Sequence, residues 1–320
     1  MNPQSAPGRL SFSSRPTSES ATEARVKLSH GIIAMLVTPF TGDFRLNEQA
    51  LRDEVQWALE NGADGVVAAP SIGEFLHLSE SERVRVFEIV LEEARKRPGT
   101  SAVAMTSGAT TLETMHYARI AGRMGYDAQQ VIAPYYWRCG EAEVERHFRM
   151  VAEAGDLPVV IYHNPALSKF TITPRFAGKL ASIANVAAFK EVLTDLQHLE
   201  ALYDEVGGRA DIYNTFRALL AGLMLGAAGG FINIFAVPAA AALNRAFKAR
   251  EFERAEEIQR RLNRCFPRGG EETLGHLGTT KVTASVVTGI DMGPARPPYM
   301  APADAAERLK LRLPALMEVL

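Results

Sequence analysis

Short apolar runs rich in β-branched residues recur along the chain from Gly31 onward, and a segment with helical periodicity separates each run from the next. Strands that are apolar on both faces and alternate with helices are typical of a parallel sheet covered by helices. Eight runs have this character: GIIAMLVTPF, DGVVAAPS, TSAVAMTSG, AQQVIAPYY, LPVVIYHNP, NVAAFKEV, RADIYNTF and GGFINIFAV. The pattern therefore predicts eight strands with helices between them.

The ends of the predicted helices carry their own signals. Asn47 stands at the N-cap position of one helical segment, and Ser79 with Glu82 three residues later forms a capping box before another. Glycine follows the helical pattern in ENGADGVV, RMGYDAQQV and LMLGAAGGF, where a left-handed residue commonly ends a helix. These signals separate helices from strands and support the alternation.

Eight strand-and-helix units predict an α/β fold of the (β/α)8 or TIM-barrel type. A doubly wound open sheet is the main alternative, but it more often has fewer strands and a glycine-rich phosphate loop. The GAAGGF segment matches neither GxGxxG nor a P-loop. The barrel is therefore the favoured fold.

Both ends of the chain depart from this alternation. Residues 1–29 are rich in Ser, Arg and Pro and lack the apolar core of a secretory signal, which predicts a disordered N-terminal tail, with a transit peptide as the alternative. After about Arg250 the segments look helical with no strands between them. The predicted organisation is a tail over 1–29, a barrel over 30–250 and a C-terminal helical extension over 251–320.

Composition excludes several classes of protein. The 47% hydrophobic and 22% charged residues are ordinary for a globular protein, and a net charge of −2 gives no broad basic surface for nucleic acid. No apolar run reaches the roughly 18 residues that a membrane helix needs. Two distant cysteines, Cys139 and Cys265, favour free thiols in a cytoplasmic protein. The seven histidines show no HxxxH or HExxH spacing, so we expect neither a metal nor a cofactor.

Polar residues interrupt the apolar runs where the predicted strands end. In a barrel of this type the chemistry lies at the carboxyl ends of the strands, so these side chains are expected to share one face. They are Thr38, Ser71, Gly73, Glu74, Tyr135, Tyr136, Tyr162, His163, Asn164, Lys190 and Asn233.

Lys190 is the most informative of these residues because it follows the apolar residues of NVAAFKEV. A lysine in an apolar site has a lowered pKa, and its neutral amine can form a Schiff base with a carbonyl substrate. Tyr162 can carry the protons that this chemistry moves. The SIGE turn offers the Ser71 hydroxyl and the backbone N–H groups around Gly73 to a substrate carboxylate.

Each of these residues also has a structural interpretation. A strand-end lysine commonly extends its amine to the surface, and a tyrosine such as Tyr162 is commonly a core residue with one hydrogen bond. We expect His163 and Glu74 to be structural. The catalytic interpretation of Lys190 and Tyr162 is favoured because the candidate groups share one end of one barrel.

Several of these motifs together resemble those of a known family. VTPF, SIGE, APYY, YHNP, FKE and GGFIN occur in the order and spacing of the dihydrodipicolinate synthase and N-acetylneuraminate lyase superfamily, over about residues 31–300. These are class I pyruvate-type aldolases built on a (β/α)8 barrel, and they are commonly tetramers or dimers of dimers.

The resemblance implies a role for each matching residue. Lys190 would form the Schiff base with pyruvate or another 2-oxo acid, and Tyr162 would donate and accept protons. Tyr136 stands where lysine-pathway members place a relay tyrosine that is lent across a subunit interface. The implied substrate-binding residues are Ser71, Ile72, Gly73, Ile232 and Asn233.

The chain also departs from the family pattern. Ile72 replaces the second of two hydroxyl residues, and Leu167 stands where dihydrodipicolinate synthases have an arginine for a second carboxylate. The PALS segment is closer to neuraminate lyases. Lys169 and Phe170, together with FPRG at 266–269, are closer to hydratase-aldolases acting on arylidene pyruvates. Lysine biosynthesis is therefore not the expected role.

We expect a cytoplasmic Schiff-base lyase that forms or cleaves a C–C bond next to a pyruvate unit, with a hydratase-aldolase on aryl-substituted pyruvates as one version. A sugar-acid dehydratase or a neuraminate lyase-like enzyme is the alternative within the superfamily, and a non-catalytic keto-acid sensor is the alternative outside it. Phe75, Trp137 and Phe216 are candidates for an apolar acceptor pocket or for ordinary core. The expected partners are small molecules and further copies of the chain, as a homotetramer or a dimer of dimers.

Overall fold

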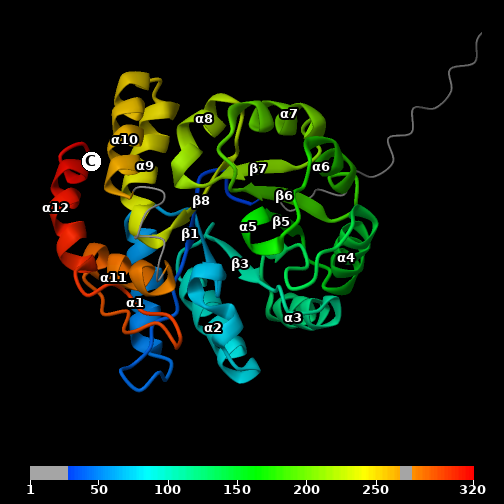
Figure 1. The fold of residues 1–320 in the computed structure, drawn as a ribbon, viewed down its shortest axis with the longest axis horizontal. Helices are drawn as coiled ribbons and strands as arrows, with labels where there is room; N and C mark the ends of the chain where they lie inside the picture. Colours follow the sequence, from blue (N-terminus) through cyan, green and yellow to red (C-terminus); the bar gives the residue numbers. More distant parts are fainter. Residues whose placement is uncertain (1–27, 267–275) are drawn as a thin grey trace, which may run out of the picture.

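Eight parallel strands close into a barrel in the computed structural model, which describes residues 28–266 and 276–320 (Figure 1). Each strand pairs with its neighbours in sequence, and the last strand pairs with the first. The strands are β1 (Ile32–Met35), β2 (Gly65–Ala68), β3 (Ser101–Met105), β4 (Ala128–Ile132), β5 (Val159–His163), β6 (Val186–Glu191), β7 (Asp211–Asn214) and β8 (Gly229–Asn233). The predicted (β/α)8 barrel is confirmed.

Helices surround the barrel between the strands. The longer ones are α1 (Glu48–Glu60), α2 (Glu80–Arg95), α3 (Thr111–Met124), α4 (Glu141–Ala154), α6 (Pro174–Leu180), α7 (Leu196–Val206), α8 (Leu219–Met224) and α9 (Val237–Lys248). Short turns of helix follow several strands: η1 (Ser71–Gly73), η2 (Phe75–His77), α5 (Pro165–Ser168), η3 (Phe216–Ala218) and η4 (Ile234–Ala236).

The helix ends form as their sequences predict. The Asn47 side chain accepts a hydrogen bond from the Ala50 N–H at the start of α1. Ser79 and Glu82 complete both halves of the capping box before α2. Gly125 ends α3 with a left-handed φ of 87°. Local sequence therefore sets where these helices begin and end.

Two glycines allow the barrel to close between β8 and β1. A Cβ atom on Gly229 would lie only 1.8 Å from the Gly31 carbonyl oxygen, and Gly229 has a φ of 155°. The Gly230 N–H donates to the same carbonyl at 2.9 Å. No side chain fits at position 229, which explains the first glycine of GGFIN.

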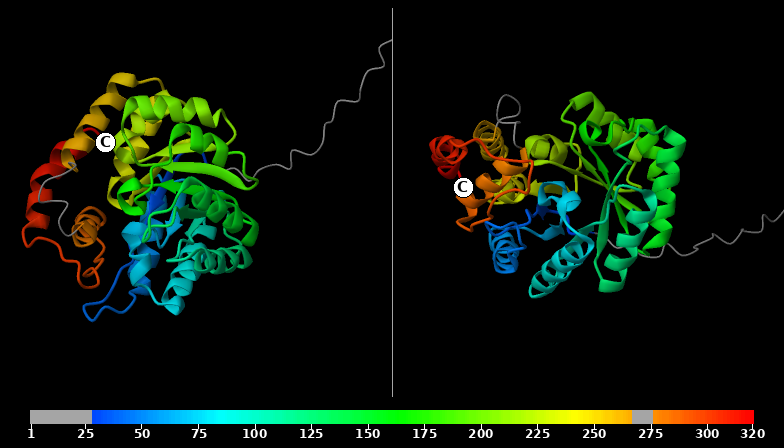
Figure 2. Two further views of the ribbon diagram at one scale, coloured as in Figure 1. Left: turned by 45° about the vertical axis from the view of Figure 1, so that its right-hand side comes forward. Right: turned by 60° about the horizontal axis from the view of Figure 1, so that its bottom comes forward.

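Among the described residues, the C-terminal extension has the helices α10 (Phe252–Cys265), α11 (His276–Thr288) and α12 (Ala305–Met317). They gather on one side of the barrel, where α10 packs on α9 and α12 packs on α10 and α11 (Figure 2). Residues 1–27 of the tail predicted over 1–29, and positions 267–269 of the FPRG motif, lie outside the described residues. None of the described helices is long and apolar enough to span a membrane.

Candidate active site

Lys190 is the penultimate residue of β6 and is 2% exposed. Its Nζ atom lies 3.8 Å from the ring centroid of Tyr162, which is its partner in register on β5. The same Nζ atom lies 2.8 Å from the thioether sulfur of Met35 on β1. Burial lowers the pKa of Lys190 to about 7. A large fraction of the amine is therefore neutral, and nucleophilic, near neutral pH.

Tyr162 presents a buried phenol beside this amine. Burial raises the pKa of Tyr162, while the Asn164 amide and the nearby Ser71 hydroxyl oppose the rise. The Asn164 Nδ2 group donates to the Tyr162 hydroxyl oxygen at 2.8 Å and fixes its position. The phenol therefore enters a reaction protonated, as a proton donor must.

The turn after β2 is held tightly and carries two left-handed residues. Ala69 has a φ of 47° and Glu74 a φ of 58°, and they flank Ser71. From the segment after β1, the Thr38 hydroxyl donates to the Gly73 carbonyl at 2.6 Å. Strained backbone of this kind tends to cluster at functional sites. The Ser71 Oγ atom is buried near the Tyr162 hydroxyl but makes no close hydrogen bond within the described chain, so it is available to a ligand.

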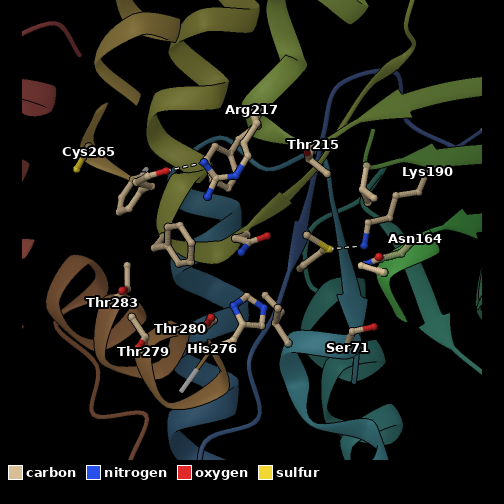
Figure 3. Close-up of a pocket in the computed structure, with 18 of the residues that line it drawn as sticks. Ser71, Asn164, Lys190, Thr215, Arg217, Cys265, His276, Thr279, Thr280 and Thr283 are labelled. Atoms are coloured by element: carbon tan, nitrogen blue, oxygen red, sulfur yellow. Dashed lines mark hydrogen bonds between the residues drawn. The ribbon is translucent and has the colours of Figure 1, made fainter. Parts of the chain in front are cut away.

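These groups line one cavity of about 540 Å³, a size typical of small-molecule sites. Figure 3 shows Lys190 and Asn164 on one side of the cavity and the α11 threonines Thr279, Thr280 and Thr283 on the opposite side. The lining between and around them includes Phe216, Phe235, Phe266, Asn233, Arg217 and Arg308. The cavity is thus formed by both the barrel mouth and the C-terminal extension.

The structure brings together five of the eight predicted site residues, because Lys190, Tyr162, Ser71, Ile72 and Asn233 all line this cavity. The other three are placed differently. Gly73 supports the turn through its carbonyl, and Ile232 is fully buried in β8. Tyr136 is 67% exposed in the loop after β4 and lines a second cavity of about 360 Å³ instead.

The three aromatic candidates for the acceptor pocket have different positions. Phe216 lines the Lys190 cavity. Trp137 is 77% exposed and borders the second cavity, and Phe75 is buried with its ring edge-on to Tyr135. The pocket interpretation of Trp137 and Phe75 is therefore wrong for the single chain. Phe235 and Phe266 also line the cavity, although the sequence singled out Phe266 only as part of FPRG and did not single out Phe235. Their places in the cavity depend on tertiary packing, which the local pattern does not reveal.

Glu191, the residue after Lys190, organises a buried network that the sequence did not reveal. Its carboxylate lies 2.7 Å from His163 Nδ1, 3.0 Å from His198 Nε2, and accepts the Leu193 N–H at 2.7 Å. Burial alone would raise the pKa of Glu191, but the two histidines lower it. The network fixes the backbone directly after Lys190.

The ring nitrogens and carboxylate of this network lie within 4.8 Å of one another, as metal ligands would. However, the Ile172 N–H donates to His163 Nε2 at 3.0 Å, so Nδ1 must carry the ring proton and faces Glu191 as a donor. A protonated nitrogen does not ligate a metal. The arrangement fits a hydrogen-bond network, and His163 is structural as expected.

Glu74 is also structural, and it has a partner that the sequence did not identify. Its side chain is fully buried and pairs with Lys281 of α11, whose Nζ atom lies 3.1 Å from Glu74 Oε1. Burial lowers the pKa of Lys281 to about 8, although Glu74 opposes the shift. Lys281 is thus a second buried lysine, but it is paired with a carboxylate and does not line the cavity that contains Lys190.

Comparison with known proteins agrees with this geometry. Residues 28–315 match the dihydrodipicolinate synthetase family. The chain is 31% identical over 284 residues to a 4-hydroxy-tetrahydrodipicolinate synthase of Thermomicrobium roseum, covering 88% of this chain and 92% of that protein. It is 31% identical over 238 residues to N-acetylneuraminate lyase of Escherichia coli K12, covering 73% and 79%.

Solved structures give the same assignment. A putative dihydrodipicolinate synthetase from Pseudomonas aeruginosa superposes with a TM-score of 0.81 at 26% identity, covering 90% of this chain and 99% of that one. A prophage protein of the same family from E. coli K12, in complex with pyruvate, superposes with a TM-score of 0.81 at 25% identity, covering 90% and 98%. The chain therefore belongs to the dihydrodipicolinate synthetase family and is a lyase of the superfamily of Schiff-base aldolases that includes dihydrodipicolinate synthase and N-acetylneuraminate lyase.

Proposed function

We propose that Lys190 forms a Schiff base with pyruvate or another 2-oxo acid, and that the enzyme forms or cleaves the C–C bond next to that unit. The observation that carries this proposal is the buried amine of Lys190, with a pKa near 7, against the phenol of Tyr162 in one cavity. The neutral amine adds to the C2 carbonyl, water leaves, and the protonated imine then withdraws electrons from the adjacent carbon.

Tyr162 moves the protons in this scheme. Its phenol donates the proton that the departing C2 oxygen needs, and the resulting phenolate accepts the proton of the C4 hydroxyl when the C3–C4 bond breaks. The bond electrons form an enamine and an aldehyde leaves. Protonation at C3 and hydrolysis of the imine then release pyruvate and restore the amine. Asn164, which donates to the phenol oxygen at 2.8 Å, holds Tyr162 in place and stabilises the phenolate.

The carboxylate of the 2-oxo acid is assigned to the turn after β2. The buried Ser71 hydroxyl makes no close hydrogen bond within the described residues and faces the same cavity as Lys190. We assign substrate binding also to the backbone N–H of Ile72 and to the tight turn at Gly73. The strand-eight residues Ile232 and Asn233 are assigned to the same bound 2-oxo acid. Because the Ile72 side chain has no hydroxyl, the protons of Tyr162 must pass through Ser71, water or the substrate itself.

Tyr136 is assigned to the site of a partner subunit rather than to its own. It is exposed together with Trp137 on the loop after β4, and exposed aromatic pairs are typical of protein interfaces. We infer a homotetramer or dimer of dimers in which this loop reaches the neighbouring copy. Light scattering tests the assembly. A Tyr136→Ala enzyme that regains activity when mixed with a Lys190→Met enzyme would place the two residues in one shared site.

The leading substrate is an aryl-substituted pyruvate. Leu167 and Ile72 stand in positions where the superfamily has polar groups, and three phenylalanines line the cavity beyond Lys190. Burying an apolar side chain against such a substrate contributes roughly 1.5–3 kcal/mol. Arg217 and Arg308, which also line the cavity, can pair with the substrate carboxylate. This favours a hydratase-aldolase acting on arylidene pyruvates.

A sugar acid is the second candidate, because hydroxyl and amide groups also line the cavity. Thr279, Thr280 and Thr283 present one wall from α11, and Asn233 contributes an amide from β8. These groups could hydrogen-bond a polyhydroxy chain. Comparing kcat/KM for cleavage of a benzylidene pyruvate and of N-acetylneuraminate separates the candidates, and a clear preference for the sugar acid would refute the aryl assignment.

Trapping with borohydride in the presence of pyruvate tests the central step. We expect a reduced pyruvyl adduct on the peptide that contains Lys190. Lys281 is the matched internal control, because it is equally buried but does not line the cavity. Absence of any adduct on Lys190, under conditions that trap a known class I aldolase, would overturn the Schiff-base assignment and favour a keto-acid sensor.

A further inference from the structure

A buried ionic network joins the C-terminal extension to the turn that carries Ser71. We propose that Lys281 on α11 is a positioning residue for this turn, and that it acts through Glu74 to set the geometry of the carboxylate-binding groups. The proposal rests on the function proposed above, because it assigns that turn to the substrate carboxylate.

The Lys281 side chain is 1% exposed, and its ammonium has several polar and aromatic neighbours. Its Nζ atom donates to the Pro294 carbonyl at 2.8 Å, lies 3.1 Å from Glu74 Oε1, and lies 3.8 Å from the ring centroid of Phe40. An ammonium so deeply buried is retained only with such partners. The neighbouring residue Thr280 lines the Lys190 cavity, so one turn of α11 serves both the cavity wall and the network.

Glu74 connects this lysine to the turn. Its other carboxylate oxygen accepts the Arg296 N–H at 3.0 Å and lies 2.9 Å from His77 Nδ1. Its backbone is left-handed, with a φ of 58°, and directly follows the Ser71–Gly73 turn. The Glu74 N–H donates to the Ser71 carbonyl at 3.3 Å and its carbonyl accepts the His77 N–H at 2.7 Å. The side chain is therefore fixed at several points while the backbone is strained.

Arg296 reinforces the same link from the segment that follows α11. Its guanidinium donates to the His77 carbonyl at 2.5 Å and to the Glu82 carboxylate at 2.9 Å and 2.5 Å. Residues from the extension thus contact Glu74, which precedes η2, and His77, at its end. The turn is therefore held both by Thr38, which follows β1, and by residues of the extension.

Loss of the Lys281 ammonium leaves the Glu74 carboxylate buried with less positive charge around it. The carboxylate then moves toward Arg296 or toward water, and the left-handed backbone at Glu74 relaxes with it. The Ser71 hydroxyl and the Ile72 N–H shift because they belong to the same turn. A displacement of about 1 Å in a positioning group can reduce its contribution on the order of 100-fold, and here that contribution is the binding of the carboxylate. The effect falls on binding of the 2-oxo acid and not on the basicity of Lys190.

The test is the pyruvate dependence of borohydride trapping in the wild type and in Lys281→Met. We expect the pyruvate concentration for half-maximal trapping to rise about tenfold or more in the variant. The trapping rate at saturating pyruvate and its pH midpoint should stay close to those of the wild type. Unchanged half-saturation in a folded Lys281→Met protein overturns the proposal.

Ile258→Ala is the matched control for a general loosening of the extension. Ile258 is a fully buried residue of α10 that does not line the cavity. We expect a lower melting temperature in this variant but wild-type half-saturation, whereas an equal rise in both variants would refute a specific role for Lys281.

Glu74→Gln keeps the proposal testable if Lys281→Met does not fold. The glutamine preserves the shape and the acceptor for the Arg296 N–H but removes the charge that Lys281 holds. We expect the pyruvate concentration for half-maximal trapping to rise in this variant too, by a smaller factor than in Lys281→Met. An unchanged value refutes the proposal. A wild-type protein that traps no pyruvate at all would instead refute the proposed function, and this inference with it.

Discussion

Replacing Lys190 with methionine should make the protein more stable at low pH, by an amount that shrinks as the pH rises. In the folded protein burial lowers the pKa of Lys190 from 10.5 to about 7. Below pH 7 the lysine is charged in both the folded and the unfolded chain, so the folded state carries the full cost of the buried ammonium. Between pH 7 and 10.5 the unfolded chain binds more protons, so the free energy of unfolding of the wild type rises with pH.

The size of the effect follows from the pKa difference. At pH 6 the cost of the buried ammonium is about 5 kcal/mol, and at pH 9 it has fallen to about 2 kcal/mol. The stability advantage of Lys190→Met should therefore shrink by about 3 kcal/mol over this range. Other groups, including Lys281, titrate in both proteins and cancel in the difference.

Urea unfolding of both proteins at pH 6, 7.5 and 9 measures this difference directly. Tyr162 and Met35 contact the altered side chain, so a constant offset between the two curves is expected from repacking. The pH dependence of the offset is the informative quantity. Two curves that run parallel from pH 6 to pH 9 would show that the Lys190 pKa is not depressed, and would refute the reasoning that makes it a nucleophile.

Three further predictions concern activity. The rate of imine formation with pyruvate should rise with pH through a midpoint near 7, because only the neutral Lys190 amine attacks; a midpoint near 10 would contradict this. Tyr162→Phe should lower turnover by roughly 10²–10⁴-fold with the fold intact, whereas Tyr126→Phe, which removes only a structural bond to the Phe87 carbonyl, should not. Condensation of pyruvate with aspartate semialdehyde should be inefficient because Leu167 cannot pair with a second carboxylate; rescue of a lysine-requiring strain would contradict this.

The barrel and the pairing of Lys190 with Tyr162 could be predicted because both depend on local pattern. Eight buried runs with capping signals define the strands and helices, and neighbouring strands of a parallel barrel end on one face. The two residues come from consecutive strands and prove to be partners in register. Nothing beyond the order of the elements was needed to place them together.

The rest of the site depends on contacts between segments far apart in the chain. Arg308 and the α11 threonines reach the cavity only because the extension folds back over the barrel mouth. The pairing of Glu74 with Lys281 joins residues that no spacing rule connects. Trp137 was expected near the acceptor pocket, but the loop after β4 carries it outward to a different cavity. Helix periodicity shows that a face is buried without showing which surface covers it.

The contact between Lys190 and Met35 has a chemical consequence for the resting enzyme. A thioether is a weak hydrogen-bond acceptor, so Met35 packs against the amine but does little to stabilise its protonated form. A carboxylate in the same place would hold the ammonium as an ion pair and raise its pKa, removing the nucleophile. Oxidation of Met35 to the sulfoxide would act in the same direction, since the new S–O group is a polar acceptor pointed at the nitrogen. The soft sulfur at this position keeps the lone pair of Lys190 available to an electrophile.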